Sequence, residues 1–351
     1  MHFNDKATQR QFDQDGYCKL QLLSPDAITD LTAFAKDFIM AEEVKNTDYG
    51  MYVSLEEEAS RKQKITDYVR SVVAPALSEH VSNYKIHLGG YLIKAADDQK
   101  YTFPHQDWIF VAHGTSAVSA TVWISLLDIG PENGTLGFLK GSHKFLDFPI
   151  GSPSPAVPTP AMGKEPIIFE HLTFETVKAG EALIFNNKTI HAALPNSGSF
   201  PRLAVGIGIT PADAPLHHYF LNPENEKELL QLRVNESFYM TYNNDDLYQL
   251  YQVSKLPNGV EVTGRVPVNR ESYPSEEKLL ASIATHGNVK NNYSLNLGKH
   301  FGQPIEQATD DSVTETAPEE SEWIDNRTFF ETYTPINIYR EAKMRIGKWL
   351  R

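Results

Sequence analysis

The sequence predicts a mostly β fold with flanking helices, and three regions of the chain carry this prediction. Residues 84–210 hold β-branched and aromatic runs separated by Gly, Pro, Asn and Asp, which is typical of a strand-rich body. Before that body, apolar residues recur at helical spacing over 24–43 and, more weakly, over 57–80. After residue 215 the pattern turns helical again, which predicts a largely helical C-terminal extension.

The first helix has a clear beginning. Ser24 is a good N-cap and Pro25 suits the first helical position, after which Ile28, Leu31 and Phe38 recur on one face. A short strand-like run over 17–23 precedes this helix.

Two strands of the β body are the most informative. In the segment 118–129, Val118, Val122 and Ile124 alternate with polar residues and one Trp, so one face should pack on a core and the other face either meets solvent or lines a polar cavity. In the segment 202–210, Arg202 shares a face with small residues, including Gly206 and Gly208. Glycine inside a strand often marks the close approach of a ligand or another backbone.

The second half of the chain is less regular. Six prolines in residues 149–166 predict a long, stiff loop that is either a lid or a disordered insertion. Helices are expected from the cap Asn222 and over 275–287, whereas the acidic residues 302–323 read as a flexible tether. The sequence therefore suggests an N-terminal domain over 1–215 and an extension over 216–351.

The amino-acid composition limits the classes of partner and of metal site that the protein can have. The 351 residues include 32 basic and 45 acidic side chains, a net charge of −13, which disfavours nucleic acid and anionic lipid as partners. The single cysteine, Cys18, excludes an intrachain disulfide and a multi-thiolate metal site, and it favours a cytoplasmic location. The sequence contains no run of about 18 consecutive apolar residues, so it does not predict a membrane-spanning helix.

One histidine arrangement has the spacing of a metal site. His105 and Asp107 are two residues apart, so on an extended chain they point to the same side, and His191 follows 84 residues after Asp107. Two histidines and one carboxylate form the facial triad that holds non-haem Fe(II) and leaves positions open. The spacing alone is weak, because a chain with twelve histidines contains such pairs by chance.

Other residues strengthen this hypothesis. Arg202, on a strand face of small residues, is a natural bidentate partner for a dicarboxylate, although a salt bridge at the core edge would also explain it. Thr121 and Trp123, on the polar face of the 118–129 strand, are candidates to line the same cavity.

Four segments together resemble the phytanoyl-CoA dioxygenase family of Fe(II)- and 2-oxoglutarate-dependent oxygenases. They occur in the family's order and cover about the first 210 residues: FDQDGYCKLQLLSPDAITDL, HQDW at 105–108, TVWISLLDIGPENGTLGFLKGSHK at 121–144, and AGEALIFNNKTIHAALPNSGSFPRLAVGIG at 179–208. Lys140 departs from the family, which usually has proline before the GSH turn.

This resemblance implies a double-stranded β-helix, a jelly roll of the cupin kind. It also implies that His105, Asp107 and His191 are the iron ligands and that Arg202 binds the distal carboxylate of 2-oxoglutarate. Gln106 and Trp123 match family positions that line the co-substrate site. The implied cofactors are Fe(II), 2-oxoglutarate and O2, and the implied reaction oxidises a small organic substrate with release of succinate and CO2. Asp107 favours hydroxylation or a related oxidation over halogenation, because related halogenases have a small residue at this position.

Two other functions remain open at this point. One is a cupin-type metal enzyme that does not use 2-oxoglutarate, and the other is a jelly-roll binding protein without catalysis. The extension over 216–351 is expected either to cover the mouth of the pocket or to form a homodimer. The substrate itself cannot be derived from the sequence.

Overall fold

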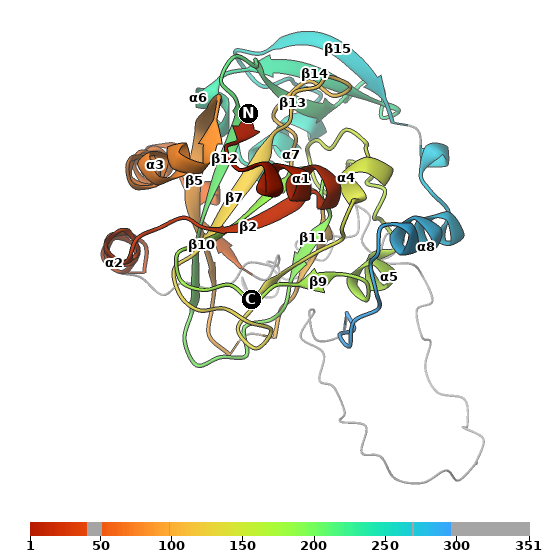
Figure 1. Ribbon diagram of the computed structural model, residues 1–351. Coiled ribbons are helices and arrows are strands. Elements are labelled where there is room, and N and C mark those ends of the chain that lie inside the picture. The colour runs from red at the N-terminus through yellow and green to blue at the C-terminus, as the bar shows by residue number, and fades with distance from the viewer. Residues whose placement is uncertain (41–50, 98, 269, 296–351) are drawn as a thin grey trace, which may run out of the picture. The chain divides into compact units, whose positions relative to one another are not determined.

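The structure, a computed structural model, describes residues 1–40, 51–97, 99–268 and 270–295, all within a unit that spans Met1–Leu295 (Figure 1). Its α-helices are α1 Lys6–Asp15, α2 Pro25–Phe34, α3 Ala59–His80, α4 Ser142–Phe145, α5 Glu165–Phe169, α6 Glu236–Thr241, α7 Asn244–Gln252 and α8 Glu276–Thr285. A π-helix over Ala35–Ile39 continues α2, and short 3-10 turns occur at Ser54–Glu56 and Arg270–Ser272.

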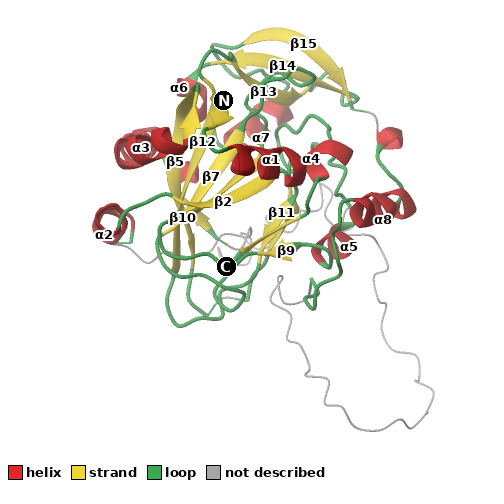
Figure 2. Ribbon diagram, in the orientation of Figure 1, coloured by secondary structure: helices red, strands yellow, loops and turns green. Residues whose placement is uncertain are grey.

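The strands are more numerous than the helices in this part of the chain (Figure 2). They are β1 His2–Phe3, β2 Tyr17–Gln21, β3 Tyr52–Val53, β4 Val81–Ser82, β5 Tyr84–Lys94, β6 Thr102–His105, β7 Ala120–Ser125, β8 Leu136–Phe138, β9 Thr173–Phe174, β10 Glu181–Asn186, β11 His191–Ala193, β12 Arg202–Pro211, β13 Leu216–Leu221, β14 Glu228–Val234 and β15 Glu261–Pro267. The prediction of a mostly β protein with helices is confirmed.

The strands from β5 to β12 alternate between two antiparallel sheets, except that β8 and β9 both lie in the smaller one. The larger sheet has the order β2-β10-β7-β12-β5-β3, and the smaller has the order β6-β11-β8-β9. A buried cluster between the sheets takes side chains from both, among them Trp123 and Ala204 from the larger sheet and Phe138 and Ala193 from the smaller one. This alternation around a shared core is the arrangement expected of a jelly roll.

Helices cover the outer face of each sheet. Alternation along β7 and β12 places Val122, Ile124, Val205 and Ile207 on the side of α2 and α3, where they join a large apolar cluster. The smaller sheet packs its outer face against α5 and α8, whose buried residues Ile168, Leu279 and Ile283 belong to a second cluster. Figure 1 shows α2 and α3 on one side of the sheets and α5 and α8 on the other.

Most elements predicted before residue 215 are present. Ser24 caps α2 by accepting from the backbone N–H of Ala27 at 3.3 Å, and Pro25 is its first residue. The pattern over 57–80 becomes α3, and the two informative strands become β7 and β12.

No helix in the described residues is long and apolar enough to cross a membrane.

The expectation of a largely helical extension holds only in part for residues 216–267, where the helices α6 and α7 lie between the strands β14 and β15. Strands β13, β14 and β15 form a three-stranded antiparallel sheet there, and the segment after Asn222 is a turn followed by β14 rather than a helix. Leu230 and Leu232 pack into one apolar cluster and Leu229 packs into another, whereas Gln231 is half-buried and Arg233 is exposed. The adjacent Leu229 and Leu230 interrupt the strict apolar and polar alternation that identifies a strand in a sequence.

Of the other expectations for the extension, the structure tests only the helix over 275–287. The helix over 275–287 is confirmed as α8, with Ser275 as its N-cap. The acidic segment 302–323 lies outside the described residues. The boundary between two domains at residue 215 stays a prediction.

Candidate metal centre

Strand pairing brings the three predicted ligands together. His105 ends β6 and His191 begins β11, and these two residues are direct partners in the antiparallel pair of the smaller sheet. Asp107 follows β6 by two residues, and its backbone N–H donates to the carbonyl of Asn187 at 2.9 Å. Residues far apart in the sequence therefore meet because the jelly roll pairs these two strands.

The geometry of the three side chains fits a metal ion. Oδ1 of Asp107 lies 3.7 Å from Nε2 of His105 and 3.7 Å from Nε2 of His191. One donor atom from each of the three residues lies within 4.8 Å of the others, and in the described residues this is the group of His, Cys, Asp and Glu that could hold a metal. His191 is buried, whereas His105 and Asp107 keep partial access to solvent.

Both imidazoles are oriented by backbone carbonyls. Nδ1 of His105 bonds to the carbonyl of Phe103 at 2.7 Å, and Nδ1 of His191 bonds to that of Thr189 at 3.1 Å. Each bond assigns the proton to Nδ1 and leaves Nε2 with a lone pair for a metal. Burial, with the nearby His105, lowers the pKa of His191 to about 4, so its ring is neutral at pH 7, the form that binds metals.

The two carboxylate oxygens of Asp107 have different neighbours. Oδ1 faces the histidines, whereas Oδ2 accepts from the hydroxyl of Thr121 at 2.7 Å and from the amide nitrogen of Asn187 at 3.4 Å. Thr121 was expected to line the co-substrate site, but in the structure its hydroxyl proton goes to Asp107. Sequence reasoning missed Asn187, whose position four residues before His191 is the only hint of its role.

Arg202 is buried between the sheets, and no charged group among the described residues pairs with it. Its side chain is 0% exposed, and its guanidinium donates to the carbonyls of Gly134 at 2.9 Å and Leu92 at 3.4 Å. In the part of the chain that the structure describes, no carboxylate pairs with it and Nε has no partner. Burial lowers its pKa to about 9, which reflects an uncompensated cation rather than a salt bridge.

Two further buried donors, from Trp123 and Thr102, lack partners among the described residues. Trp123 has an unbonded Nε1, and its ring centroid lies 5.3 Å from the guanidinium carbon of Arg202. Thr102 has an unbonded hydroxyl; it pairs with Ala193 of β11, whose side chain belongs to the core cluster that contains Trp123. Sequence reasoning missed Thr102, because a threonine three residues before a histidine is not by itself a signal.

Gln106 is held in place by two backbone carbonyls, and its role at the co-substrate site stays a prediction. Its amide nitrogen donates to the carbonyls of Leu146 at 3.0 Å and Lys188 at 2.6 Å, so both of its N–H groups are used by the protein. The side chain joins two loops beside the metal ligands.

The glycines of β12 do not leave an empty recess. A Cβ at Gly206 would lie 2.6 Å from a methyl group of Leu92, and one at Gly208 would lie 2.8 Å from Nε2 of His87. Both positions are thus close approaches of neighbouring side chains, and the space that the sequence suggested for a ligand is filled by the protein at these two residues.

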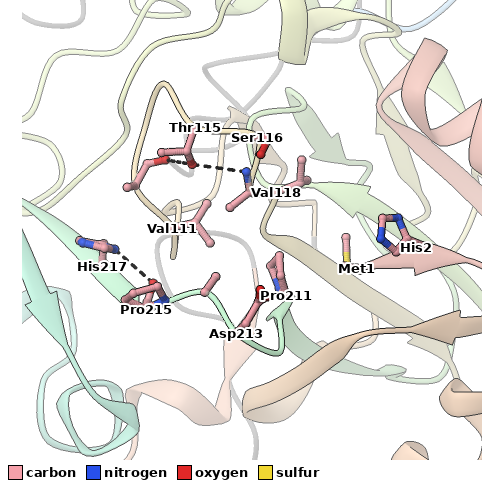
Figure 3. A pocket seen from close by; sticks show the side chains of 13 residues that line it. Met1, His2, Val111, Thr115, Ser116, Val118, Pro211, Asp213, Pro215 and His217 are labelled. Carbon is pink, nitrogen blue, oxygen red and sulfur yellow. Dashed lines mark hydrogen bonds between the residues drawn. The ribbon is translucent and has the colours of Figure 1, made fainter.

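A cavity of about 410 Å³ lies elsewhere, between the loop 111–118 and the turn from β12 to β13 (Figure 3). Pro211, Asp213 and His217 line it, and Nδ1 of His217 bonds to the carbonyl of Pro215 at 3.1 Å. None of the three candidate metal ligands lines this cavity.

Several solved structures resemble this chain at low sequence identity. SnoN, an epimerase crystallised with Fe3+, α-ketoglutarate and nogalamycin RO, is 22% identical over 60% of this chain and 85% of its own, with a TM-score of 0.43. SnoK, a non-haem α-ketoglutarate-dependent carbocyclase from nogalamycin biosynthesis, is 19% identical over 60% and 86%, with a TM-score of 0.45. HygX from Streptomyces hygroscopicus, with nickel and 2-oxoglutarate bound, is 14% identical over 60% and 88%, with a TM-score of 0.42.

No curated protein sequence is significantly similar to the chain. A family model does match it: the model described as phytanoyl-CoA dioxygenase covers residues 12–204, more than half of the chain. The matched region contains β5 to β11 and most of the residues that surround the candidate metal centre. The chain belongs to the phytanoyl-CoA dioxygenase family.

Proposed function

We propose that this protein is an Fe(II)- and 2-oxoglutarate-dependent dioxygenase that hydroxylates, or otherwise oxidises, a small organic substrate. The observation that carries the proposal is that one jelly roll holds both a two-histidine, one-carboxylate cluster and a buried arginine without a charged partner among the described residues. Bound Fe(II) with 2-oxoglutarate and O2 supplies an oxidant that removes hydrogen from a substrate, with release of succinate and CO2.

The donor set suits iron. His105, Asp107 and His191 offer two neutral nitrogens and one carboxylate oxygen, which would hold the metal from one side and leave positions for other ligands. Because Asp107 fills the third ligand position, no halide site is open there, which favours hydroxylation or a related oxidation over halogenation.

The buried donors suit a dicarboxylate. Arg202, Trp123 and Thr102 each hold at least one buried N–H or O–H without an acceptor, and leaving such groups unpaired is costly. A carboxylate bonded to Arg202 would neutralise the buried cation and give acceptors to its neighbours. We therefore assign the distal carboxylate of 2-oxoglutarate to Arg202, with Trp123 and Thr102 beside it.

The test needs no substrate. The anaerobic apoprotein is titrated with Fe(II) and 2-oxoglutarate, and the visible metal-to-ligand charge-transfer band is recorded. Wild type should give the band, H105A should not, and R202A should bind Fe(II) normally but need about 10- to 100-fold more 2-oxoglutarate, since a hydrogen-bonded charge pair contributes about 1.5–3 kcal/mol.

Other outcomes favour the two alternatives. If wild type binds Fe(II) but gives no band, a cupin-type metal enzyme that does not use 2-oxoglutarate becomes the better reading. If wild type binds neither Fe(II) nor 2-oxoglutarate, a non-catalytic jelly-roll binding protein becomes the better interpretation. Succinate release in the presence of candidate substrates then identifies what is oxidised.

Two further expectations remain part of this proposal. A cytoplasmic location is supported by the single, buried Cys18, which needs no oxidising compartment. Homodimerisation through residues 216–351 is tested by comparing the mass of the full chain in solution with that of one 39.5 kDa chain.

A further inference from the structure

The hydrogen bonds around Asp107 form a chain with a fixed direction. The amide nitrogen of Asn187 donates to the hydroxyl of Thr121 at 2.8 Å, and that hydroxyl donates to Oδ2 of Asp107 at 2.7 Å. A hydroxyl has one proton, so once its lone pair receives the Asn187 amide, its proton is directed at the carboxylate.

The opposite amide orientation is unfavourable. Turning Asn187 over would place its carbonyl oxygen against Oδ2 of Asp107, where both groups are acceptors. Backbone bonds hold this arrangement in place, because Asn187 accepts from the N–H of Asp107 at 2.9 Å and donates its own N–H to the carbonyl of Ser119 at 3.1 Å.

The two carboxylate oxygens of Asp107 therefore have different roles. Oδ2 is occupied by Thr121 and Asn187, and Oδ1 alone faces Nε2 of both histidines, at 3.7 Å from each. A carboxylate that binds a metal through one oxygen takes one coordination position, whereas a bidentate carboxylate takes two. A six-coordinate metal then keeps three positions free.

We infer that Thr121, oriented by Asn187, is a positioning residue that restricts Asp107 to monodentate metal binding. The inference rests on the proposed function, in that it requires a metal at the His-Asp-His cluster. Thr121 is not among the three candidate metal ligands, and it acts through the orientation of the Asp107 carboxylate. Loss of its hydroxyl frees Oδ2 and lets the carboxylate rotate.

The test measures metal binding, not turnover. Co(II) is titrated into the apoprotein of wild type, T121V, T121S and the control T210V, and both the dissociation constant and the visible d–d bands are recorded. T121V keeps the side-chain shape but removes the hydroxyl, and it should weaken Co(II) binding about 10- to 100-fold and change the bands. T121S should restore both.

T210V is a matched control, since Thr210 is also buried in the larger sheet but has a hydroxyl without a partner. It should bind Co(II) like wild type, and thermal unfolding of each variant shows that the fold is kept. Equal affinity and equal bands for wild type and T121V overturn this inference alone. Absence of Co(II) binding in wild type overturns the proposed function and this inference with it.

Discussion

Single buried groups without partners define the interior of this site. Arg202, Trp123 and Thr102 carry buried donors that no described residue satisfies, although native interiors leave few such groups unpaired. These donors come from three different strands, β12 and β7 of the larger sheet and β6 of the smaller one. At the residue scale the unpaired donors, more than the shape of a cavity, indicate what the site binds.

Thr102 provides a test at this scale. Replacing it with valine removes one hydroxyl and preserves the shape, so 2-oxoglutarate should bind about 3- to 10-fold more weakly, as one neutral hydrogen bond contributes about 1 kcal/mol. Fe(II) affinity should not change, because Thr102 is not among the candidate metal ligands. The charge-transfer titration measures both quantities, and T102S is the matched control. Unchanged affinity for 2-oxoglutarate in T102V would remove Thr102 from the site.

At the scale of elements, the proline-rich segment 149–166 is tied to the sheet of β13, β14 and β15. Ser152 forms a parallel bridge with Phe220, and its hydroxyl bonds to Nε2 of the buried His218 at 2.7 Å. His218 in turn meets the ring of Trp108, the residue after Asp107, with ring centroids 4.7 Å apart. The three-stranded sheet thus supports both the loop and the segment that follows the metal ligands.

Asn244 at the start of α7 is the clearest point at which to loosen this loop. Its side chain accepts from the N–H of Ser154 at 2.8 Å and donates to the carbonyl of the same residue at 2.9 Å. N244A should therefore raise the rate at which proteases cleave within 149–164, because local opening becomes easier. Limited proteolysis followed by mass spectrometry measures this rate. The exposed N258A serves as the control, and equal cleavage of both variants would contradict the role of Asn244.

For the whole molecule, buried histidines link stability to pH. Burial lowers the pKa of both His87 and His218 to about 3, from an unfolded value near 6.5. Between these values the unfolded chain binds protons that the native protein does not bind, so the free energy of unfolding decreases as the pH falls below about 6.5. The limiting slope is about 1.4 kcal/mol per pH unit for each histidine.

Urea unfolding at several pH values between 7.5 and 4.5 measures this dependence. The midpoint should fall steadily towards acid in wild type. H87L removes a ring whose two nitrogens are buried without partners among the described residues, so its midpoint should fall less steeply. A variant with the same pH dependence as wild type would show that His87 is not protonated on unfolding in this range.

Local chemistry was sufficient for much of the fold. Ser24 and Pro25 predicted the start of α2 because capping depends on neighbouring residues, and the alternation in 118–129 predicted β7 because one of its faces meets a helix-covered core. The two-residue spacing of His105 and Asp107 indicated two candidate metal ligands for a similarly local reason, although this spacing is weak by itself and the resemblance to the family was needed to assign the set with His191.

Other features of the fold and of the site were decided by the tertiary structure, because they depend on contacts between segments that are distant in the sequence. Asn222 has the chemistry of a helix cap, but pairing between β13 and β14 made the following residues a strand. Gly208 suggested space for a ligand, but His87 from β5 occupies it. The partners of Asp107 come from β7 and from the segment before β11, and only the packing of the two sheets brings these groups to one carboxylate.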